Sequence, residues 1–314
     1  MRIQQLQYLE KIAEKGSINE AAKELYLSQP SLSNAVKELE HEMGVQLLLR
    51  TKSGVTLTHD GREFMIYARQ VLDQIQLLEE RYKSNTKRKE HFFISAQHYA
   101  FVVHAFVELI KSVDTDEYQF GLRETETQNI FEDLATFKSE LGILYLNSFN
   151  RQVMEKLFKE YKLTFYPLFE AEPHVFLCRE HPLANQDKIT LEELEDFPYL
   201  CYDQGEDNSF YFSEEILSTL DRKMTIKVSD RATIFNLMVG LNGYTISSGI
   251  LSRELNDDKI IAIPLDVEDT MTMGYLMPHM LEPSPIAKKY LKLLKEHIRN
   301  YGFEVMEWKK NKLL

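Results

Sequence analysis

The stretch from Ile18 to Gly44, INEAAKELYLSQPSLSNAVKELEHEMG, constrains the fold more than any other part of the chain. Its pattern predicts two helices joined by a few residues. In the second helix Leu32, Val36, Leu39 and Met43 recur at spacings of four, three and four, which gives the buried stripe of an amphipathic helix. The opposite face carries serine, asparagine and lysine. We therefore expect a helix-turn-helix whose second helix presents a small polar face to a partner.

Cap residues predict where these helices begin and end. A first helix ends at Gly16, and Ser17 with Glu20 forms a Ser-x-x-Glu capping box for the next helix. Ser28, followed by Gln29-Pro30, opens the second helix of the motif. Proline is tolerated there because first-turn amides have no partner within the helix.

Two further elements are predicted after the motif. The segment VQLLLRTKSGVTLT alternates and contains Ser53-Gly54, which predicts a β-hairpin. Thr58 then caps a long helix, and residues 84–90, SNTKRKE, follow it as a linker. Because a long apolar seam needs a second chain, we expect a dimer. The seam consists of Phe64, Ala68, Val71, Ile75, Leu78 and Tyr82.

The charge is distributed unevenly along the chain. Of the net charge of −12, residues 1–90 carry +1 and residues 91–314 carry −13, so a nearly neutral module precedes an acidic body. Cys178 and Cys201 are the only cysteines, which excludes a disulfide scaffold and a four-cysteine metal site. The charged N-terminus is not a signal peptide, and no apolar run reaches the roughly 20 residues of a membrane span. We expect a cytoplasmic protein of two or three domains.

From His91 onward strands alternate with helices, which predicts a parallel α/β sheet. A second block begins near Pro167, and two crossovers between two lobes would place a ligand cleft between them, beyond the carboxyl ends of strands. The expected domains are a helix-turn-helix at 1–58, a dimerising linker helix and hinge at 59–90, and an effector unit at 91–314, with one lobe at 91–166 and 267–314 and the other at 167–266.

These residues match a known family. The segment from Gln4 to Gly61 resembles the winged helix-turn-helix of the LysR-type transcriptional regulators. Residues 180–200 and 230–249 are similar to two recurrent segments of the effector domain of that family. Leu48 departs from the family, which commonly has phenylalanine there, and the tail EWKKNKLL has no counterpart. The matching positions are Gly16, Ser17, Ala21, Ala22, Leu25, Ser28, Gln29, Pro30, Ser33, Leu39, Glu40, Gly44, Leu47, Arg50, Leu57, Thr58 and Gly61.

The resemblance implies a multidomain fold: a winged helix-turn-helix dominated by helices, a long linker helix, and a two-lobed α/β effector domain like the periplasmic binding proteins. It implies a bacterial homo-oligomer, usually a tetramer, that binds an interrupted inverted repeat in a promoter and a small-molecule coinducer, with RNA polymerase as a further partner to be considered. It implies no cofactor and no catalytic residue. The cleft segment SAQHYAFVVHAF is similar to regulators of sulfur amino-acid metabolism in Gram-positive bacteria.

The predicted DNA contacts lie at the start of the recognition helix and in the hairpin. A recognition helix presents its N-terminal residues to base edges, where short hydroxyls and amides can donate and accept. A hairpin wing meets sugar-phosphate or the minor groove. The alternatives are solvated helix residues and, for Arg50, an internal salt bridge. The expected set is Ser28, Gln29, Pro30, Ser31, Ser33, Asn34, Lys37, Arg50 and Lys52.

The predicted effector contacts follow the strand ends. The first stretch, residues 95–99, also opens a helix, whose free amides favour an anion such as a carboxylate. We therefore expect an anionic metabolite as coinducer. The alternative is that these are polar loop residues, and that His98 only caps a helix. The expected set is Ser95, Ala96, Gln97, His98, Tyr99, Tyr145, Asp203, Gln204 and Thr245.

Rival readings have less support in the sequence. Cys178 and Cys201 lie in apolar strands, so we expect inert core thiols and no redox pair. His174, Cys178 and His181 fit strand alternation and a turn better than a metal site. No nucleophile elbow, phosphate loop or dinucleotide fingerprint is present, so we expect no enzyme. The alternative function is a solute-binding or enzymatic α/β domain in which DNA binding is secondary.

Overall fold

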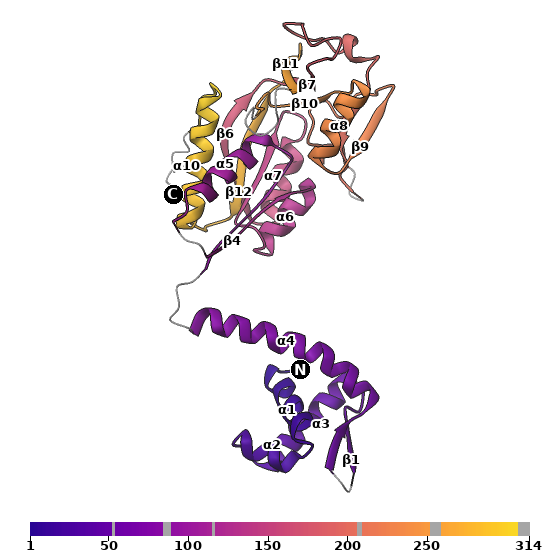
Figure 1. The fold of residues 1–314 in the computed structure, drawn as a ribbon, viewed down its shortest axis with the longest axis vertical. Coiled ribbons are helices and arrows are strands. Elements are labelled where there is room, and N and C mark those ends of the chain that lie inside the picture. Colours follow the sequence, from indigo (N-terminus) through magenta and orange to yellow (C-terminus); the bar gives the residue numbers. More distant parts are fainter. Residues whose placement is uncertain (52–53, 84–88, 115–116, 206–208, 252–258, 307–314) are drawn as a thin grey trace. The chain divides into compact units, whose positions relative to one another are not determined.

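The computed structural model describes the chain except residues 52–53, 84–88, 115–116, 206–208, 252–258 and 307–314 (Figure 1). It contains two compact units, Met1–Arg88 and Lys89–Leu314. In the described residues, no helix is both long enough and apolar enough to cross a membrane.

The N-terminal unit is a small helical domain with a two-stranded wing. Its core is formed by α1, α2 and α3 and is closed by the start of α4, because the apolar stripes of these helices face one another. The elements are α1 (Ile3–Lys15), α2 (Ile18–Glu24), α3 (Gln29–Met43), β1 (Leu48–Thr51), β2 (Gly54–Leu57) and α4 (His59–Lys83).

The predicted cap residues Gly16, Ser17 and Ser28 are confirmed, and of the Ser17–Glu20 capping box the described residues show the hydrogen bond made by the Ser17 hydroxyl. Gly16 ends α1 in the left-handed conformation, at φ 62°. The Ser17 hydroxyl accepts a hydrogen bond from the Glu20 amide, and the Ser28 hydroxyl accepts one from the Ser31 amide at 3.2 Å. These side chains satisfy amides that the first helical turn leaves without partners.

The predicted hairpin is confirmed, and three contacts fix it to the helices. The Glu40 carboxylate of α3 accepts hydrogen bonds from the Leu47 and Leu48 amides, at 2.8 and 2.9 Å. The Val55 amide donates to the Gly16 carbonyl at 2.8 Å. The wing therefore keeps a fixed position against α3 and the α1–α2 turn.

The apolar seam predicted for α4 is used in two ways. Ala68, together with Met65, is buried in the core of this unit. Farther along the helix, Val71, Leu78 and Tyr82 are exposed. The prediction of one continuous intermolecular seam is thus wrong for its first turns, which pack within the chain, whereas Val71, Leu78 and Tyr82 of the later turns are exposed.

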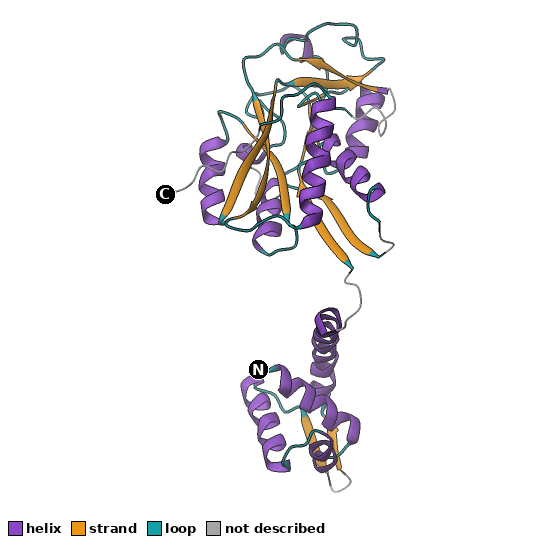
Figure 2. Cartoon of the chain, turned by 90° about the vertical axis from the view of Figure 1, so that its left-hand side faces the viewer, coloured by secondary structure: helices purple, strands orange, loops and turns teal. Residues whose placement is uncertain are grey.

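The first lobe of the C-terminal unit is built on a five-stranded sheet in the order β4-β3-β5-β12-β6, with α5 and α10 on one side and α6 and α7 on the other (Figures 1 and 2). Its elements are β3 (Glu90–Ala96), α5 (Ala100–Lys111), β4 (Tyr118–Glu124), α6 (Thr127–Ala135), β5 (Leu141–Leu146), α7 (Arg151–Glu160), β6 (Leu163–Ala171), β12 (Met271–Pro278) and α10 (Pro285–Asn300).

This sheet differs from the predicted parallel sheet. β3 is parallel to β4 and β5, but β12 runs antiparallel to both β5 and β6, because the chain returns from the second lobe in the opposite direction. β6 keeps residues 167–171 in the first lobe, past the expected lobe boundary. Pro167 sits where the register shifts between Met273 and Gly274, a position that tolerates its missing amide.

The second lobe contains two smaller sheets, β10-β7-β11 and β8-β9. The chain enters this lobe after Ala171 and leaves it after Pro264, so two crossovers join the lobes as expected. The Thr190–Glu193 capping box forms, but it begins only one 3₁₀ turn. The elements are β7 (His174–Cys178), η1 (Glu192–Leu194), β8 (Tyr199–Tyr202), η2 (Phe210–Phe212), β9 (Thr225–Val228), α8 (Arg231–Leu241), β10 (Thr245–Ser247) and β11 (Ile260–Pro264).

Candidate functional site

The outer face of α3 is exposed at most of the predicted positions. Gln29, Pro30, Asn34 and Lys37 are exposed. Ser28 is the cap of the helix, and its hydroxyl also lies 2.7 Å from the exposed Ser31 hydroxyl. The face therefore combines short polar side chains with one lysine, in the arrangement that base-edge and phosphate contacts require.

Ser33 is placed differently from the expectation. Only 6% of the residue is exposed, and its hydroxyl accepts a hydrogen bond of 2.9 Å from Nη2 of Arg50. The wing covers this turn of α3, which explains the burial. The internal partner of Arg50 is thus a serine hydroxyl and not the acidic residue of a salt bridge. Lys52 lies outside the described residues.

The positive charges near this face are free. In the described part of the chain, Lys37 and Arg50 form no ion pair. By contrast, Lys11 pairs with Glu14 and Glu24 on the α1–α2 side of the unit. Lys37 and Arg50 are therefore available to a phosphate, whereas the charge of Lys11 is neutralised within the protein.

Ser95 and Ala96 lie inside the first lobe. The Ser95 hydroxyl donates to Asp133 at 2.6 Å and lies 2.8 Å from the Ser139 hydroxyl, while Arg123 pairs with the same Asp133 carboxylate. Ala96 is fully buried. The structure does not bring these two predicted contact residues to the cleft.

Gln97 holds neighbouring residues of the cleft in position through hydrogen bonds. Its amide nitrogen donates to the Thr127 hydroxyl at 2.7 Å. Its carbonyl oxygen accepts from the Tyr99 hydroxyl at 2.7 Å and from the Tyr145 amide at 3.2 Å. The side chain is fully buried, and both its amide nitrogen and its carbonyl oxygen form hydrogen bonds within the protein. It therefore holds other residues of the cleft in place.

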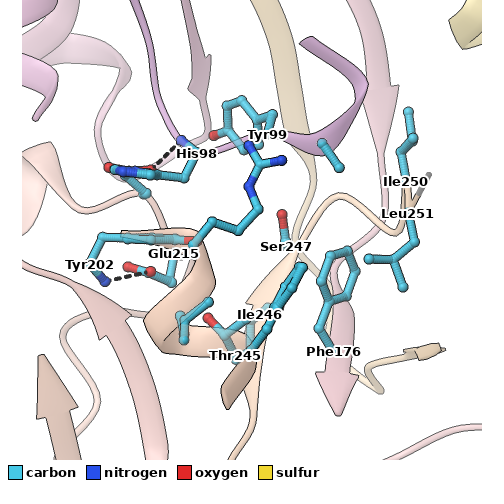
Figure 3. Close-up of a pocket in the computed structure, with 15 residues that line it drawn as sticks. His98, Tyr99, Phe176, Tyr202, Glu215, Thr245, Ile246, Ser247, Ile250 and Leu251 are labelled. Carbon is cyan, nitrogen blue, oxygen red and sulfur yellow. Dashed lines mark hydrogen bonds and ion pairs between the residues drawn. The ribbon is translucent and has the colours of Figure 1, made fainter. Parts of the chain in front are cut away.

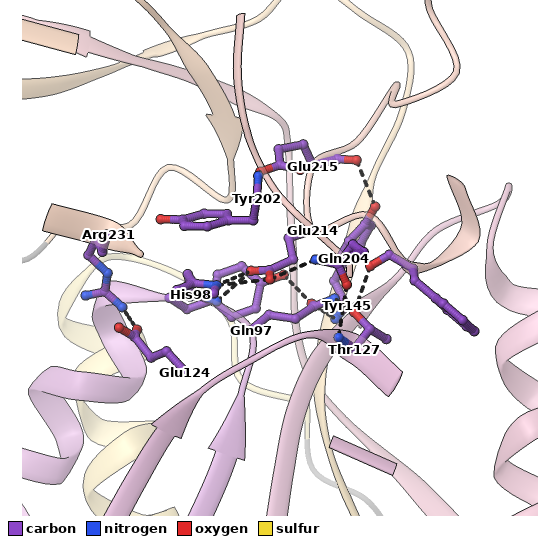
Figure 4. A network of polar contacts seen from close by, with 12 residues as sticks. Gln97, His98, Glu124, Thr127, Tyr145, Tyr202, Gln204, Glu214, Glu215 and Arg231 are labelled. Atoms are coloured by element: carbon purple, nitrogen blue, oxygen red, sulfur yellow. Dashed lines mark hydrogen bonds and ion pairs between the residues drawn. The ribbon is translucent and has the colours of Figure 1, made fainter. Parts of the chain in front are cut away.

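His98 joins the two lobes. Its ring stacks on Tyr202 of the second lobe, with centroids 3.9 Å apart and an interplanar angle of 6°. Nδ1 lies 2.9 Å from the Glu214 carboxylate, and the His98 amide donates to the same carboxylate at 2.7 Å (Figure 4). Gln204 donates to Glu214 at 3.1 Å. One buried carboxylate thus binds groups of both lobes.

Further contacts cross the cleft beside it (Figure 4). The Thr127 amide donates to Gln204 at 3.0 Å, and the Tyr145 hydroxyl donates to the Glu215 carbonyl at 3.2 Å. Arg231 forms an ion pair with Glu124. Asp203 is exposed and lies 3.8 Å from Lys227, so it is turned away from this network.

A pocket lies between the lobes beside this network (Figure 3). Its cavity volume is about 30 Å³ for a water-sized molecule, so it leaves little room for a ligand in this arrangement of the lobes. Thr245 lines it with a buried hydroxyl that has no partner in the described structure, and the buried Nε of Arg231 is also without one. The lining residues are His98, Tyr99, Ala100, Phe176, Tyr202, Glu214, Glu215, Arg231, Ile234, Phe235, Thr245, Ile246, Ser247, Ile250 and Leu251.

Burial changes the pKa of two charged groups of the pocket. It lowers the pKa of Arg231 to about 10, which still leaves the guanidinium protonated at neutral pH. Burial, and then the neighbouring Glu214 carboxylate, raise the pKa of Glu215 well above its usual value. The Tyr202 amide donates to Glu215 at 2.9 Å and offsets part of this effect.

The sequence-based site missed Tyr202, Glu214, Glu215 and Arg231. Arg231 is the only charged residue in the apolar helix α8, and that isolation is a signal the sequence does contain. Glu214 and Glu215 follow a short 3₁₀ turn with no recognisable pattern, so nothing in the sequence places them across from His98.

The cysteines and histidines outside the cleft have structural surroundings. Burial raises the pKa of the Cys201 thiol to about 12, so very little thiolate is present at neutral pH. Cys178 is buried in β7. His181 lies 3.1 Å from the Asn242 carbonyl, and His174 lies 2.9 Å from the Glu172 carbonyl. The described residues contain no metal-binding cluster of three or more side chains.

Two family models match the chain. Residues 3–62 match a model described as a bacterial regulatory helix-turn-helix protein of the lysR family, and residues 116–299 match the LysR substrate binding domain.

Similar proteins extend over almost the whole chain. The uncharacterised HTH-type transcriptional regulator YnfL of Escherichia coli K12 is 27% identical and aligns with 92% of this chain and 96% of its own length. The uncharacterised regulator YvbU of Bacillus subtilis is 26% identical, over 94% of this chain and 98% of its own. A solved structure of the Corynebacterium glutamicum OxyR C206 mutant has a TM-score of 0.54 at 20% identity, covering 95% and 94% of the two chains, which shows a shared fold.

The raised pKa of Glu215 predicts a pH dependence of stability. Because its folded pKa lies above the unfolded value near 4.5, the stabilisation from its bound proton is present below that value and is lost as the pH rises through the folded pKa. Glu215→Gln removes this loss. We expect its melting temperature, relative to the wild type, to rise as the pH is increased above 4.5 in differential scanning fluorimetry. Glu180→Gln, at an exposed position of the same lobe, should follow the wild type. Parallel curves for Glu215→Gln and the wild type would contradict the assignment.

Proposed function

Because this chain belongs to the LysR family of bacterial transcriptional regulators, we propose how this DNA-binding regulator uses its two candidate sites. α3 and the wing read promoter DNA, and the interlobe cleft binds a carboxylate-bearing coinducer. The proposal that the cleft binds a carboxylate rests on the buried Arg231. It lines the pocket with an unpartnered Nε, and the unpartnered Thr245 hydroxyl lines the same pocket. The alternative of an enzyme is set aside, since the matching proteins are regulators.

For DNA, the exposed face of α3 supports base contacts by Gln29, Pro30 and Asn34, with Lys37 at phosphate. Arg50 is held by Ser33 and supports backbone contact from the wing. Ser33 then acts through Arg50 and not on a base. Ser28 and Ser31 form the N-terminal cap of α3 and are suited to contact a DNA phosphate next to it. The DNA contact of Lys52 stays a prediction. The cytoplasm, where bacterial promoters lie, is the expected location.

The DNA assignment predicts two distinct kinds of loss. On an operator selected from random sequences by the purified protein, Asn34→Ala should lower the ratio of operator to random-DNA affinity about tenfold, because a base contact is worth ~1–3 kcal/mol. Arg50→Gln should weaken binding to both DNAs and reduce the salt slope by about one, as for a lost phosphate contact. Ser33→Ala should resemble Arg50→Gln. Fluorescence anisotropy across a salt series measures all three, and an equal loss on both DNAs for Asn34→Ala would reassign it to phosphate.

We further propose that the exposed apolar side chains of the later turns of α4 form a homodimer, and that dimers associate into the tetramer implied by the family. Val71, Leu78 and Tyr82 give an exposed apolar surface on one face of the helix, and Tyr67 adds to it. A surface of this kind is stabilised by pairing with a second copy. RNA polymerase is kept as a partner to be tested.

A charge placed in this surface should break the dimer. Leu78→Glu is expected to give monomers in sedimentation velocity, because burying an unpaired carboxylate is unfavourable. Gln74→Glu adds the same charge at an exposed polar position of α4 and should remain dimeric. If Leu78→Glu sediments like the wild type, dimerisation lies elsewhere.

The coinducer acts, in this proposal, by shifting the population between arrangements of the two lobes, which changes the spacing of DNA-binding modules and the bend of the DNA. Some of the predicted residues are suited to contact the coinducer, and others hold the contact residues in place. These residues are Gln97, His98, Tyr99, Tyr145 and Gln204. Asp203, Ser95 and Ala96 are less suited, because they lie away from the pocket. The link to sulfur amino-acid metabolism stays a prediction.

Arg231→Gln tests the effector site. A thermal-shift screen of small carboxylates should find compounds that stabilise the wild type, and these should change its DNase I footprint and bend. Arg231→Gln should weaken the same compounds about tenfold or more, the value of a lost charge-assisted hydrogen bond. Lys223→Gln, which removes an exposed cation of the same lobe, should behave as the wild type. An unchanged footprint and bend at saturating ligand would exclude the population-shift mechanism.

A further inference from the structure

The charges that line the interlobe pocket are out of balance. Glu214 and Glu215 contribute two carboxylates, with exposures of 3% and 2%, and Arg231 contributes one guanidinium. We propose that the coinducer is a zwitterion, an α-amino acid with an apolar side chain, whose ammonium group binds Glu215 and whose carboxylate binds Arg231. This inference rests on the proposed function, since it specifies the ligand of the same cleft.

The ammonium end follows from the unequal pairing of the two glutamates. Glu214 is bound by His98 and Gln204. Glu215 accepts from the Tyr202 amide and forms no ion pair among the described residues, and the Arg222 guanidinium lowers its pKa less than burial and Glu214 raise it. A buried carboxylate without a cation is costly, and the cost is removed when a cation binds it or when it takes up a proton. A ligand ammonium supplies that cation from inside the pocket.

The carboxylate end is formed by donors of the second lobe. Arg231 has its buried Nε unpartnered, and its guanidinium is paired with Glu124, which is partly exposed at 24% of its side chain. A ligand carboxylate can therefore replace Glu124 while Glu124 moves to solvent. The unpartnered Thr245 hydroxyl lines the same pocket and can donate to the second oxygen.

The remaining wall is apolar. Figure 3 shows Ile246 beside Thr245 at the lower edge of the pocket, and Phe176, Ile250 and Leu251 on its right-hand side. An apolar ligand side chain buries its surface there, which a small polar zwitterion such as glycine cannot do. Because the closed cavity is only about 30 Å³, binding requires the lobes to separate and the contacts across the cleft to exchange.

Proton linkage distinguishes this ligand from a simple carboxylate. Burial raises the pKa of Glu215 and so favours a bound proton in the unliganded site, whereas an incoming ammonium favours the ionised carboxylate and displaces that proton. Binding of the zwitterion therefore releases a proton and strengthens as the pH rises. A carboxylate without an amine leaves that proton in place. The titratable and charged groups that act on Glu215, or on which it acts, are Glu214, Arg222, Tyr99, Tyr145, Tyr199, Tyr202 and Cys201.

The experiment uses matched sets of three compounds on the full chain. L-Alanine, L-valine, L-leucine, L-norleucine and L-phenylalanine are each compared with the deaminated acid and the decarboxylated amine, as for norleucine, hexanoate and pentylamine. Isothermal titration calorimetry is run in buffers of different ionisation enthalpy. We expect at least one amino acid to bind at least about tenfold more tightly than both of its counterparts, with proton release, because it alone makes both charged contacts.

Variants separate the two proposals. Glu215→Gln should lose the preference for the amino acid over the deaminated acid and the proton release, while Arg231→Gln should weaken both compounds. Glu180→Gln, an exposed control, should match the wild type. If deaminated acids bind as well as or better than the amino acids, or if Glu215→Gln keeps the preference, the zwitterion is overturned and the carboxylate site stands. If neither acids nor amino acids bind, both proposals fail.

Discussion

The contact between His98 and Glu214 is the interaction on which the arrangement of the two lobes depends. One carboxylate binds the His98 amide and ring from the first lobe and Gln204 from the second, in a place almost without solvent. Removing one partner of a buried pair costs about 3–5 kcal/mol, whereas exchanging it for an equivalent partner costs little. A ligand that supplies replacement charges can therefore change the lobe arrangement, while random fluctuations break it only at a high cost.

A few hydrogen bonds also hold the wing against α3 in the DNA-binding unit. Glu40 ties the wing to α3 through two amides, and Ser33 holds Arg50 from the same helix. Gln29, Asn34 and Lys37 remain exposed on α3 and take no part in these contacts. The separation is useful because a rigid support lets short side chains meet base edges without a further ordering cost.

The helices, their caps and most strands follow from local sequence rules, since Ser17, Ser28 and Gly16 satisfy or end helical hydrogen bonding within a few residues. The mixed sheet could not be predicted in this way. Whether β12 runs parallel or antiparallel to β5 depends on the path through the second lobe, which no local pattern records. Local patterns are also insufficient for the site. The end of a strand predicts residues 95–99, but Glu214 contacts His98 across 116 residues of sequence, which no local pattern can indicate.

The closed cleft also sets the apparent affinity of any coinducer. If only a fraction of the molecules is open, the apparent dissociation constant is the intrinsic one divided by that fraction, so each contact across the cleft weakens binding in proportion to its effect on closure. Glu124 already pairs with the Arg231 guanidinium, which is the cation that a ligand carboxylate would use in the proposed site. In the proposed mechanism Glu124 therefore competes with the ligand for Arg231, and its displacement would couple binding to a change in lobe arrangement.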